Sequence, residues 1–470
     1  MSALKHHLVW RGALAGAALL LPAAALAATV AFTGGTVHTI TNGDLENATV
    51  VVKDGKIAAV GTSVDVPSDA TVVDCAGKHV WPGMVSANTT LGLTEISSVA
   101  GSEDTEETGP TNPDIRGEVE FNPDSDLLPV TRVNGITTAL VIPQGGAVSG
   151  TSALMHLSGW TWEDMTVKAP VGLHVRWPNM TPNRAWWETR SDEQQAAARD
   201  SAIRIITTAF DNGRAYWKAR SAEGSGGVPR HDRDVKWDAM GKALRGEIPV
   251  IIEAGEVNQI RAALKFVDDQ QLKKVILISG SDAALIGDEL KARDIPVIVD
   301  ATLRMPNRRW DPYDMASTAP ERLRAAGVKY CISDGGGNWN DRNLPYNASM
   351  AVAFGLPHDE GLKSVTIYPA QILGVADQVG SIEPGKRGDI VVTNGDLLEI
   401  PTQVSAVYIN GVATSMETRQ TRLFEKYNNR PKPAAAVAAS AAAAKGGAAT
   451  STKAAPKGGA PAGKTQSMKK

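Results

Sequence analysis

The feature that most constrains the fold is an alternation of short apolar runs and amphipathic stretches through the middle of the chain. Seven apolar runs predict strands: HVWPGMVSA, TTALVIP, VGLHVRW, IPVIIEA, KVILISG, IPVIVDA and KYCISDG. Helices are predicted at 192–219, 256–270, 282–293, 318–326 and 347–355. Strands that alternate with helices over about 300 residues indicate parallel βα units, and this length fits one α/β, TIM-like (β/α)8 barrel.

Two β-rich blocks flank this region. The first contains ATVVVKDGKIAAVG with an Asp54-Gly55 turn, which is a strong hairpin signal. The second contains GDIVVTNGD and VSAVYINGVAT. We expect both ends of the chain to form one small β-sandwich. The predicted domains are its first part at 28–80, the barrel at 81–378, and its second part with a closing segment at 379–430.

The N-terminus predicts a secretory signal peptide over residues 1–27. Lys5, His6, His7 and Arg11 form a basic region, GALAGAALLLPAA is a short apolar run, and ALA at 25–27 offers a cleavage site. We therefore expect an exported protein located in the periplasm. An uncleaved membrane anchor is the alternative, although the apolar run is short for a bilayer.

The other end, 431–470, is an Ala/Lys/Gly/Pro-rich tail that is predicted to be disordered. Seven of the 48 basic residues lie in this tail and two in the leader, which leaves 39 against 51 acidic residues, or about −12, for residues 28–430. A body this acidic argues against nucleic acid as a partner. The tail is a candidate for contact with anionic envelope polymers. Cys75 and Cys331 are the two cysteines, and a disulfide and two separate thiols both stay open.

Chemistry in such barrels gathers at the carboxyl ends of the strands. The residues that end the apolar runs are therefore the candidate site residues: Asn88, His174, Glu253, Ser279, Asp300 and Asp334. A long acidic, Pro-rich loop, EISSVAGSEDTEETGPTNPDIRGEVEFNPDSD, follows the first strand. It is either a lid or rim of the site or a solvated surface excursion.

Several segments taken in order resemble one family. WPGMVSANTTLGL, VNGITTALVIPQGG, VTIYPAQILGVADQVGSIEPGKRGDIVV and VSAVYINGV are similar to segments of the amidohydrolase superfamily, in particular of exported imidazolonepropionase-like members. The resemblance covers roughly residues 29–415. It implies a metal-centred barrel that hydrolyses non-peptide C–N bonds in amides or cyclic amides, with one or two divalent metals activating water and a strand-8 aspartate taking its proton.

The metal positions that this resemblance implies are degenerate. The H-x-H pair that should end strand 1 is Asn88 and Thr90, the strand-5 histidine is replaced by Glu253, and the strand-6 histidine falls at or near Ser279. Asp334 keeps the strand-8 acid/base position, and His174 is near the uncertain strand-4 position. A hydrolytic zinc site needs about three protein ligands, usually with imidazole among them. We therefore expect no bound zinc or other cofactor, although a weakly bound hard metal on oxygen ligands stays open.

Three hypotheses follow. The first is a non-catalytic amidohydrolase that binds a small amide-like ligand or serves as a partner subunit, in a homo- or hetero-oligomer with a related amidohydrolase. The second is an active hydrolase that acts on C–N bonds through Asp334 and Glu253 with a non-standard or weakly bound metal. The third is a structural or envelope-associated protein. His156 lies in an apolar alternation, SALMHLSG, and is interpreted as a strand side chain.

Overall fold

The computed structural model describes residues 29–224 and 229–431. The predicted leader and residues 432–470 of the predicted tail lie outside the described residues, so neither prediction is tested. The chain divides into two units, one ending at Thr418 and the other beginning at Arg419. The second unit contributes one described helix, α13 (Arg419–Asn428), none of whose residues is buried. No helix among the described residues is long and apolar enough to cross a membrane.

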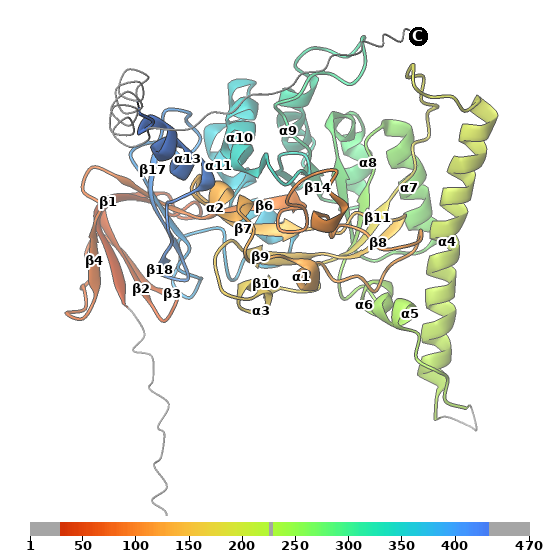
Figure 1. Ribbon diagram of the computed structural model, residues 1–470, viewed down its shortest axis with the longest axis horizontal. Coiled ribbons are helices and arrows are strands. Elements are labelled where there is room, and N and C mark those ends of the chain that lie inside the picture. Colours follow the sequence, from red (N-terminus) through yellow and green to blue (C-terminus); the bar gives the residue numbers. More distant parts are fainter. Residues whose placement is uncertain (1–28, 225–228, 432–470) are drawn as a thin grey trace, which may run out of the picture. The chain divides into compact units, whose positions relative to one another are not determined.

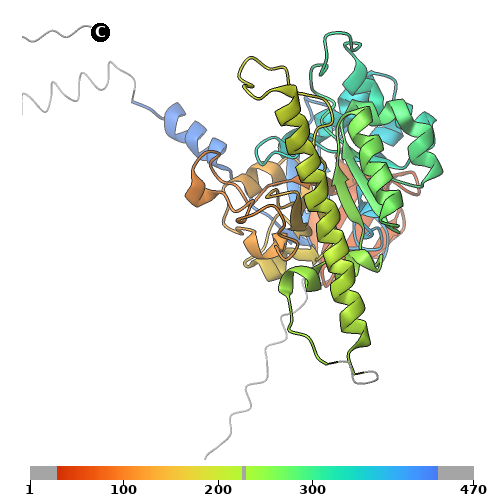
Figure 2. The ribbon, with the colours of Figure 1, turned by 90° about the vertical axis from the view of Figure 1, so that its right-hand side faces the viewer.

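The middle of the chain forms a barrel-like arrangement of strands with helices outside it (Figures 1 and 2). The strand order is continuous in two hydrogen-bonded ladders, β10-β9-β7-β6 and β15-β14-β13-β12-β11-β8. The strands are β6 (Met84–Thr89), β7 (Ile136–Val141), β8 (Val148–Thr151), β9 (Ala153–His156), β10 (Thr166–Lys168), β11 (Leu173–Arg176), β12 (Val250–Glu253), β13 (Val275–Ser279), β14 (Val297–Val299) and β15 (Tyr330–Ile332).

The segment formed by β8 and β9 departs from the all-parallel prediction. Its two halves are separated only by Ser152, and it runs antiparallel to β7 on one side and to β11 on the other. The connection that precedes it, from Ile142 to Ala147, contains no helix. A parallel neighbour needs a long crossover, whereas a short loop returns the chain antiparallel. The prediction of parallel pairing is correct for β6 with β7 and for β11 to β15.

The interior of this strand arrangement is apolar, and a short helix helps to fill it. No ladder joins β15 to β6 within the described part of the chain. α12 (Ile367–Ile372) packs against both of these strands instead, and the N–H of Val85 donates to the carbonyl of Val365 at 2.9 Å. The interior cluster contains Val85, Ala87, Leu140, Ile251, Ile276, Ile278, Ile298, Cys331, Ala370 and Leu373.

Helices cover the outside of the strands. The predicted helices are present at nearly the predicted bounds, except that the stretch predicted at 282–293 is a 3-10 turn followed by a short α-helix. α4 begins at a capping box on Ser191. The longer helices are α4 (Asp192–Ala222), α7 (Val257–Asp269), α9 (Met315–Ala325) and α10 (Leu344–Ala353). The shorter ones are η1 (Ala100–Ser102), α1 (Gly117–Glu120), α2 (Leu127–Arg132), α3 (Trp162–Met165), α5 (Val235–Ala239), α6 (Gly241–Leu244), η2 (Ser281–Ile286), α8 (Gly287–Ala292), η3 (Asp341–Asn343) and α11 (His358–Ser364).

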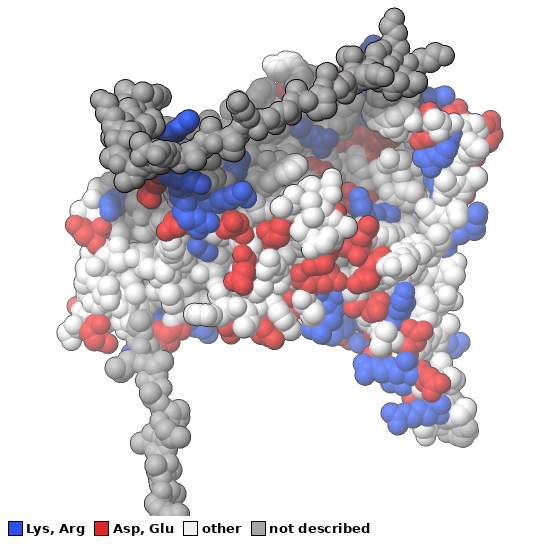
Figure 3. All heavy atoms as spheres, viewed as in Figure 1, with Lys and Arg blue, Asp and Glu red and all other residues white. Residues whose placement is uncertain are grey.

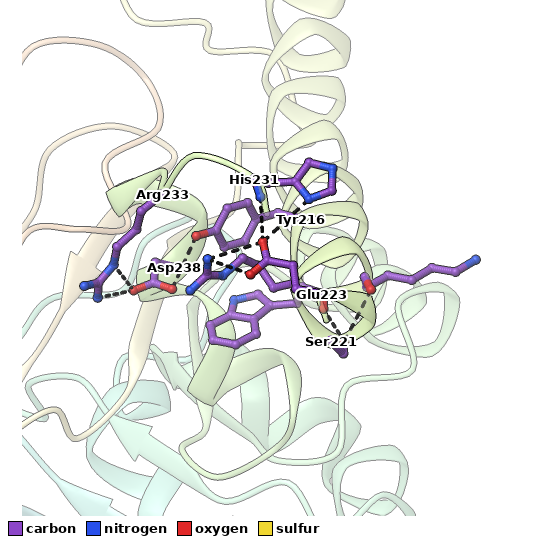
Figure 4. Close-up of polar contacts among 9 residues, drawn as sticks. Tyr216, Ser221, Glu223, His231, Arg233 and Asp238 are labelled. Carbon is purple, nitrogen blue, oxygen red and sulfur yellow. Dashed lines mark hydrogen bonds and ion pairs between the residues drawn. The ribbon is translucent and has the colours of Figure 1, made fainter. Parts of the chain in front are cut away.

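Polar contacts hold the segment after α4 against that helix (Figure 4). The Glu223 carboxylate accepts the backbone N–H of His231 at 2.9 Å. The Asp238 carboxylate accepts from the Tyr216 hydroxyl at 3.4 Å and pairs with the Arg233 guanidinium. These contacts tie the chain on both sides of residues 225–228 to one helix end, and they lie on partly exposed side chains, which is typical of structural surface pairs.

The two ends of the first unit build one sheet of order β18-β17-β16-β5-β1-β2-β3, with β4 paired to β1. Asp54 and Gly55 both have positive φ, 54° and 75°, as a tight hairpin turn requires. β5 pairs antiparallel with β16, so residues more than 300 positions apart share this sheet. Its strands are β1 (Val30–His38), β2 (Asp44–Lys53), β3 (Lys56–Gly61), β4 (Thr71–Asp74), β5 (His79–Pro82), β16 (Ile390–Thr393), β17 (Val404–Ile409) and β18 (Val412–Ala413).

A buried polar network joins this sheet to the barrel. His156, at the end of β9, lies 3.0 Å from the Asp389 carboxylate through Nε2 and 3.2 Å from the Asn410 amide through Nδ1. The other Asp389 oxygen accepts the backbone N–H of Asn410 at 2.9 Å. The two cysteines are buried and unbonded, Cys75 in the sheet core and Cys331 in the barrel interior. The disulfide that the sequence left open is therefore not formed.

Candidate functional site

Polar side chains gather where the parallel strands end. Asn88 is the residue before the last of β6, and Arg176 and Glu253 end β11 and β12. Asp300 follows β14 directly, and Asp334 lies two positions after the end of β15. Because the carboxyl ends of parallel strands meet at one face of a barrel, these side chains come from separate strands to one face. This face is the candidate functional site.

Asn88 is buried and directed at a carboxylate. Its side-chain amide lies close enough to Asp300 to lower the pKa of that carboxyl group. Gly336, which follows β15, lies against the same amide, and a Cβ at this glycine would be 3.0 Å from Asn88 Nδ2. The φ of Gly336 is +82°, so both the space and the backbone conformation favour glycine here. The amide of Asn88 is therefore held in place from two sides.

Asp334 is buried without a hydrogen-bonding partner. Its relative exposure is 6%, and neither carboxyl oxygen has a donor among the residues that the structure describes. Burial, followed by the charges of Asp341 and Asp300, raises the pKa of Asp334 above neutrality. Both effects favour the protonated form of the carboxyl group.

Asp341 is a second buried acid at this site. It accepts hydrogen bonds from the Ser86 hydroxyl at 2.6 Å and from the Thr89 hydroxyl. Both donors are on β6, so this contact fastens the loop after β15 to the opposite end of the strand order. Burial raises the pKa of Asp341, and the two hydroxyl donors lower it, with burial as the larger effect.

Asp300 links the acidic residues to the mouth of the site. Burial raises the pKa of Asp300 to about 6. The positive charge of Arg304 lowers the pKa, the negative charge of Glu253 raises it, and the nearby Asn88 amide lowers it. Arg304 Nη1 lies 3.9 Å from the Asp300 carboxylate, which is within reach of an ion pair but too long for a hydrogen bond. The Asp300 side chain is 26% exposed, so it is the most accessible of the three aspartates.

Glu253 is paired beside an open cavity. Its carboxylate lies 3.1 Å from Arg176 Nε, and the two side chains are 53% and 47% exposed. Arg176 also donates to the carbonyl of Gln144 at 2.9 Å. The cavity beside them has a volume of about 550 Å³ and is lined in part by Gly146, Trp177 and Gln259.

The other predicted site residues lie outside this group. His174 faces the interior at the level of Ile251, one layer below Glu253 in strand register, and burial alone lowers its pKa to about 3. Ser279 pairs in register with Val299, whose side chain packs in the outer core, so it points away from the interior. The prediction that Ser279 joins the site is wrong, because side chains alternate between the two faces of a strand. Thr90 begins a turn, in which its backbone carbonyl accepts hydrogen bonds from the backbone N–H groups of Leu93 and Thr94.

Three residues of this face were not predicted. Arg176 ends an apolar run two positions after His174, so the strand-end rule could have found it. Asp341 and Arg304 are in loops, and no local pattern marks them. Asp341 is 255 positions away from Ser86 in sequence, and only the approach of the segment after β15 to β6 brings them together.

The acidic loop after β6 forms part of the rim. Its backbone accepts hydrogen bonds at Thr105 and Pro110 from the loop that follows β7. Figure 3 shows acidic side chains gathered on the side of the molecule in view, over the region of α1 and β9. Burial, followed by Glu107, Asp104 and Glu118, raises the pKa of Glu120 to about 7. The loop is therefore packed onto its neighbour rather than detached from the body.

Comparison with known proteins agrees with the geometry. Residues 319–419 match the Amidohydrolase family. An imidazolonepropionase of Brucella anthropi is 24% identical over 74% of this chain and 87% of its own length. The crystal structure of an amidohydrolase from Thermotoga maritima has a TM-score of 0.73 at 26% identity, covering 82% of this chain and 99% of that one. The chain belongs to the amidohydrolase superfamily. It is an imidazolonepropionase-like member with the TIM-barrel fold of these enzymes.

Two further similarities are more limited. The amidohydrolase tasK of Hapsidospora irregularis is 23% identical over 77% of this chain, which spans 39% of the length of that relative. A prolidase complexed with N-methylphosphonate-L-proline has a TM-score of 0.50 at 17% identity over 83% of this chain, and this likeness concerns the fold alone.

The residues present do not fit the metal centre of this superfamily. The four positions where the resemblance expects imidazole hold Asn88, Thr90, Glu253 and, at or near the fourth, Ser279. His174 lies in a deeper layer, and no acidic residue contributes to its pKa shift. Within residues 29–224 and 229–431, no group of three or more His, Cys, Asp or Glu side chains is arranged to hold a metal ion. The donor set lacks the nitrogen ligands that zinc prefers.

Proposed function

We propose that this amidohydrolase-superfamily chain binds a small amide-like ligand at the carboxyl ends of its barrel strands and does not hydrolyse it through a zinc centre. The observation that carries the proposal is that Asn88 and Thr90 stand where the resemblance expects the first two metal histidines. An amide oxygen or a hydroxyl group is a poor zinc ligand beside a neutral imidazole.

The environment of Asp334 also supports a binding role. In the family chemistry that the resemblance implies, the strand-8 aspartate accepts a proton from the attacking water. Here burial, followed by the charges of two neighbouring acids, raises the pKa of Asp334 and favours its protonated form. A carboxyl group that holds its proton can donate one hydrogen bond and accept others.

The ligand class follows from the donors and acceptors at this face. Asp300 and Asp334 offer oxygen acceptors, and Arg176 and Arg304 offer donors from the exposed side. An amide or cyclic amide presents both an N–H and a carbonyl, which match this mixture. The similarity to imidazolonepropionases, which bear the name of a cyclic-amide substrate, supports the same class.

A second candidate function is hydrolysis by acidic residues with a hard, weakly bound metal. The specific observation in its favour is that neither Asp334 oxygen has a hydrogen-bond partner among the described residues, while the charge of Asp300 acts on this group. Mg²⁺ and Mn²⁺ accept oxygen ligands of this kind. Glu253, the other acid of this hypothesis, is engaged with Arg176 at the exposed rim.

The deciding experiment is elemental analysis of protein purified without chelators, combined with hydrolase assays on imidazolone, hydantoin, dihydroorotate and dipeptide-like amides. We expect well under one equivalent of zinc per chain and no turnover with added Zn²⁺, Mg²⁺ or Mn²⁺. Stoichiometric zinc together with an activity that Asp334→Ala abolishes would contradict the proposal. Turnover that depends on added Mn²⁺ and on Asp334 would favour the second candidate.

A reconstruction variant provides an independent check. Asn88→His with Thr90→His restores two imidazoles on β6 but leaves the other expected ligands absent, because Glu253 and the Ser279 region supply none. We expect this double variant to remain inactive with zinc. Hydrolysis by the variant would show that the rest of the centre is intact.

A further inference from the structure

The charge of the chain changes sign where the second unit begins. Residues 419–470 contain eleven Lys and Arg side chains and one acid, Glu425, so their net charge is +10. Residues 29–418 contain 35 basic and 50 acidic side chains, so their net charge is −15. The change coincides with the division of the chain between Thr418 and Arg419. Such a charge asymmetry within one chain is typical of a segment that contacts an anionic surface.

The described part of this basic segment is the amphipathic helix α13. Its large apolar side chains are Leu423, Phe424 and Tyr427, which fall within about 100° of one another around the helix axis. The cationic side chains of the helix occupy the adjoining sector. They are Arg419, Arg422 and Lys426. Lys426 Nζ lies 5.6 Å from the centroid of the Tyr427 ring, so the basic border is directly beside the apolar face.

The apolar face of α13 is exposed. No residue of this helix is buried, and the relative exposure is 38% for Leu423, 70% for Phe424 and 63% for Tyr427. Helices this short draw most of their stability from packing an apolar face against a partner. A partner of α13 therefore has to offer both an apolar layer for these three side chains and negative charge for the cations beside them.

We propose that α13 is an interfacial helix that binds the surface of an anionic lipid membrane. Leu423, Phe424 and Tyr427 enter the boundary between the headgroups and the acyl chains. The cations of the helix and the seven lysines of residues 431–470 contact the anionic headgroups. This binding function is separate from the ligand site at the strand ends and does not depend on it.

A membrane fits this surface better than a soluble polyanion does. Charge alone would attract any polyanion, but a soluble polyanion has no apolar layer to bury Leu423 and Phe424. A membrane surface has anionic headgroups above an apolar layer, and amphipathic helices with basic borders lie in that boundary. The ring of Tyr427 has an apolar body and a polar hydroxyl group, which suits the same depth.

The acidic first unit is the internal competitor for the basic segment. Its surplus of acidic side chains attracts the same cations. A purely electrostatic contact with the first unit would leave the apolar face of α13 in water, as the exposure of Phe424 requires. A contact that buried Phe424 would instead make α13 part of the folded core, and replacing Phe424 would then lower the stability of the protein.

The test is co-sedimentation of the purified full chain with lipid vesicles. Vesicles of phosphatidylcholine and phosphatidylglycerol in equal parts are the anionic probe, and vesicles of phosphatidylcholine alone are the neutral probe. We expect the partition coefficient for the anionic vesicles to be at least about tenfold larger at low salt and to fall as salt is added. Equal binding to the two kinds of vesicle, or binding to neither, would overturn the proposal.

A double variant tests the apolar face. Leu423→Gln with Phe424→Gln should lower the partition coefficient for anionic vesicles by about tenfold or more, because apolar contact is lost while every charge stays. Trp160→Gln removes an aromatic side chain that is 90% exposed in the first unit, so it is the matched control and should change nothing. Unchanged binding of the double variant would show that the lysines act alone, and α13 would then not be the membrane contact.

Two further measurements separate the alternative partners. Binding of poly-L-glutamate, a soluble polyanion, should be equal for the unaltered chain and the double variant, since both keep every cation. A loss as large as the loss with vesicles would show that α13 recognises polyanions in general. The urea midpoint of the double variant should equal that of the unaltered chain. A clear decrease would show that the fold itself buries the apolar face, and the membrane proposal would be wrong.

Discussion

Two regions of this molecule bury an aspartate, and they treat it in opposite ways. At the junction of the barrel and the sheet, Asp389 is paired with His156 and accepts a backbone N–H from Asn410. At the ends of the barrel strands, Asp334 has no donor within the described chain and lies beside other acids. Burial opposes ionisation at both places, yet the partners lower the pKa of Asp389 and raise that of Asp334. The first acid is therefore part of the scaffold, whereas the second has no such tie within the described chain.

The largest expected effect comes from removing the partner of the buried Asp389 carboxylate. His156→Leu removes the partner of a fully buried carboxylate, which leaves an uncompensated charge between barrel and sheet. We expect a loss of about 3–5 kcal/mol in the free energy of unfolding, measured by urea denaturation. The control is His358→Ala, because His358 is 46% exposed and pairs with Asp396 near the surface. A loss below about 1 kcal/mol for His156→Leu, the size of a surface pair, would mean that this network is not a structural tie.

The next effect has the opposite sign and concerns Asp334. A carboxyl group whose folded pKa is raised binds its proton more tightly in the native state than in the unfolded chain. The native state therefore loses stability from this group as pH rises from about 4 through neutrality, and its penalty is largest above the folded pKa.

Asp334→Asn should accordingly raise the free energy of unfolding by about 2–3 kcal/mol at pH 8 and by little near pH 4. Urea denaturation of both proteins at the two pH values measures the difference. Asp294→Asn, at an exposed position, should show no such dependence on pH. If Asp334→Asn destabilises the protein equally at both pH values, the Asp334 carboxyl group has a hydrogen-bonding partner in the folded protein.

A third prediction concerns Gly336, which lies against Asn88. Alanine at this position requires a positive φ and brings Cβ to 3.0 Å from the Asn88 amide. Gly385 has a similar φ of +92°, but nothing lies within 4 Å of its Cβ position, so Gly385→Ala isolates the backbone cost. We expect Gly385→Ala to lose about 1 kcal/mol and Gly336→Ala about 1 kcal/mol more, as measured by denaturation. Equal losses would show that Asn88 is free to move aside.

Much of the scaffold was predictable because its signals are local. Apolar runs and amphipathic periods identified β11 to β15 and the helices between them, and the Asp54-Gly55 turn identified the hairpin of β2 and β3. The strand around His156 was expected, but β8 (Val148–Thr151) was missed, and the direction of the segment depends on the short loop before it rather than on its own composition. Helix 282–293 was correct in position, but its first half is a 3-10 turn.

The site was predictable only where a strand-end rule applied. Asn88, Glu253, Asp300 and Asp334 lie at the expected face because parallel strands end together. Ser279 does not point to this face, because neighbouring residues of a strand point to opposite faces. A sequence match alone does not determine which of the two faces a residue takes. Asp341 depends on a contact with residues of β6 more than 200 positions away, for which no periodic pattern exists.

The smallest expected effect completes the comparison at Glu253. This acid belongs to the same face as Asp334, but its side chain is 53% exposed and already paired with Arg176. Water and salt screen such a pair, so Glu253→Gln should change the free energy of unfolding by less than about 0.5 kcal/mol between pH 5 and pH 8. Urea denaturation in low and high salt measures this, with Asp334→Asn as the contrasting variant. A loss above about 2 kcal/mol would show that Glu253 is tied into the fold as Asp389 is, and the contrast between scaffold acids and strand-end acids would then fail at this position. A small change would instead show that burial causes the difference between Glu253 and Asp334. Both are carboxyl groups at strand ends, and they differ mainly in their access to solvent and to a cation.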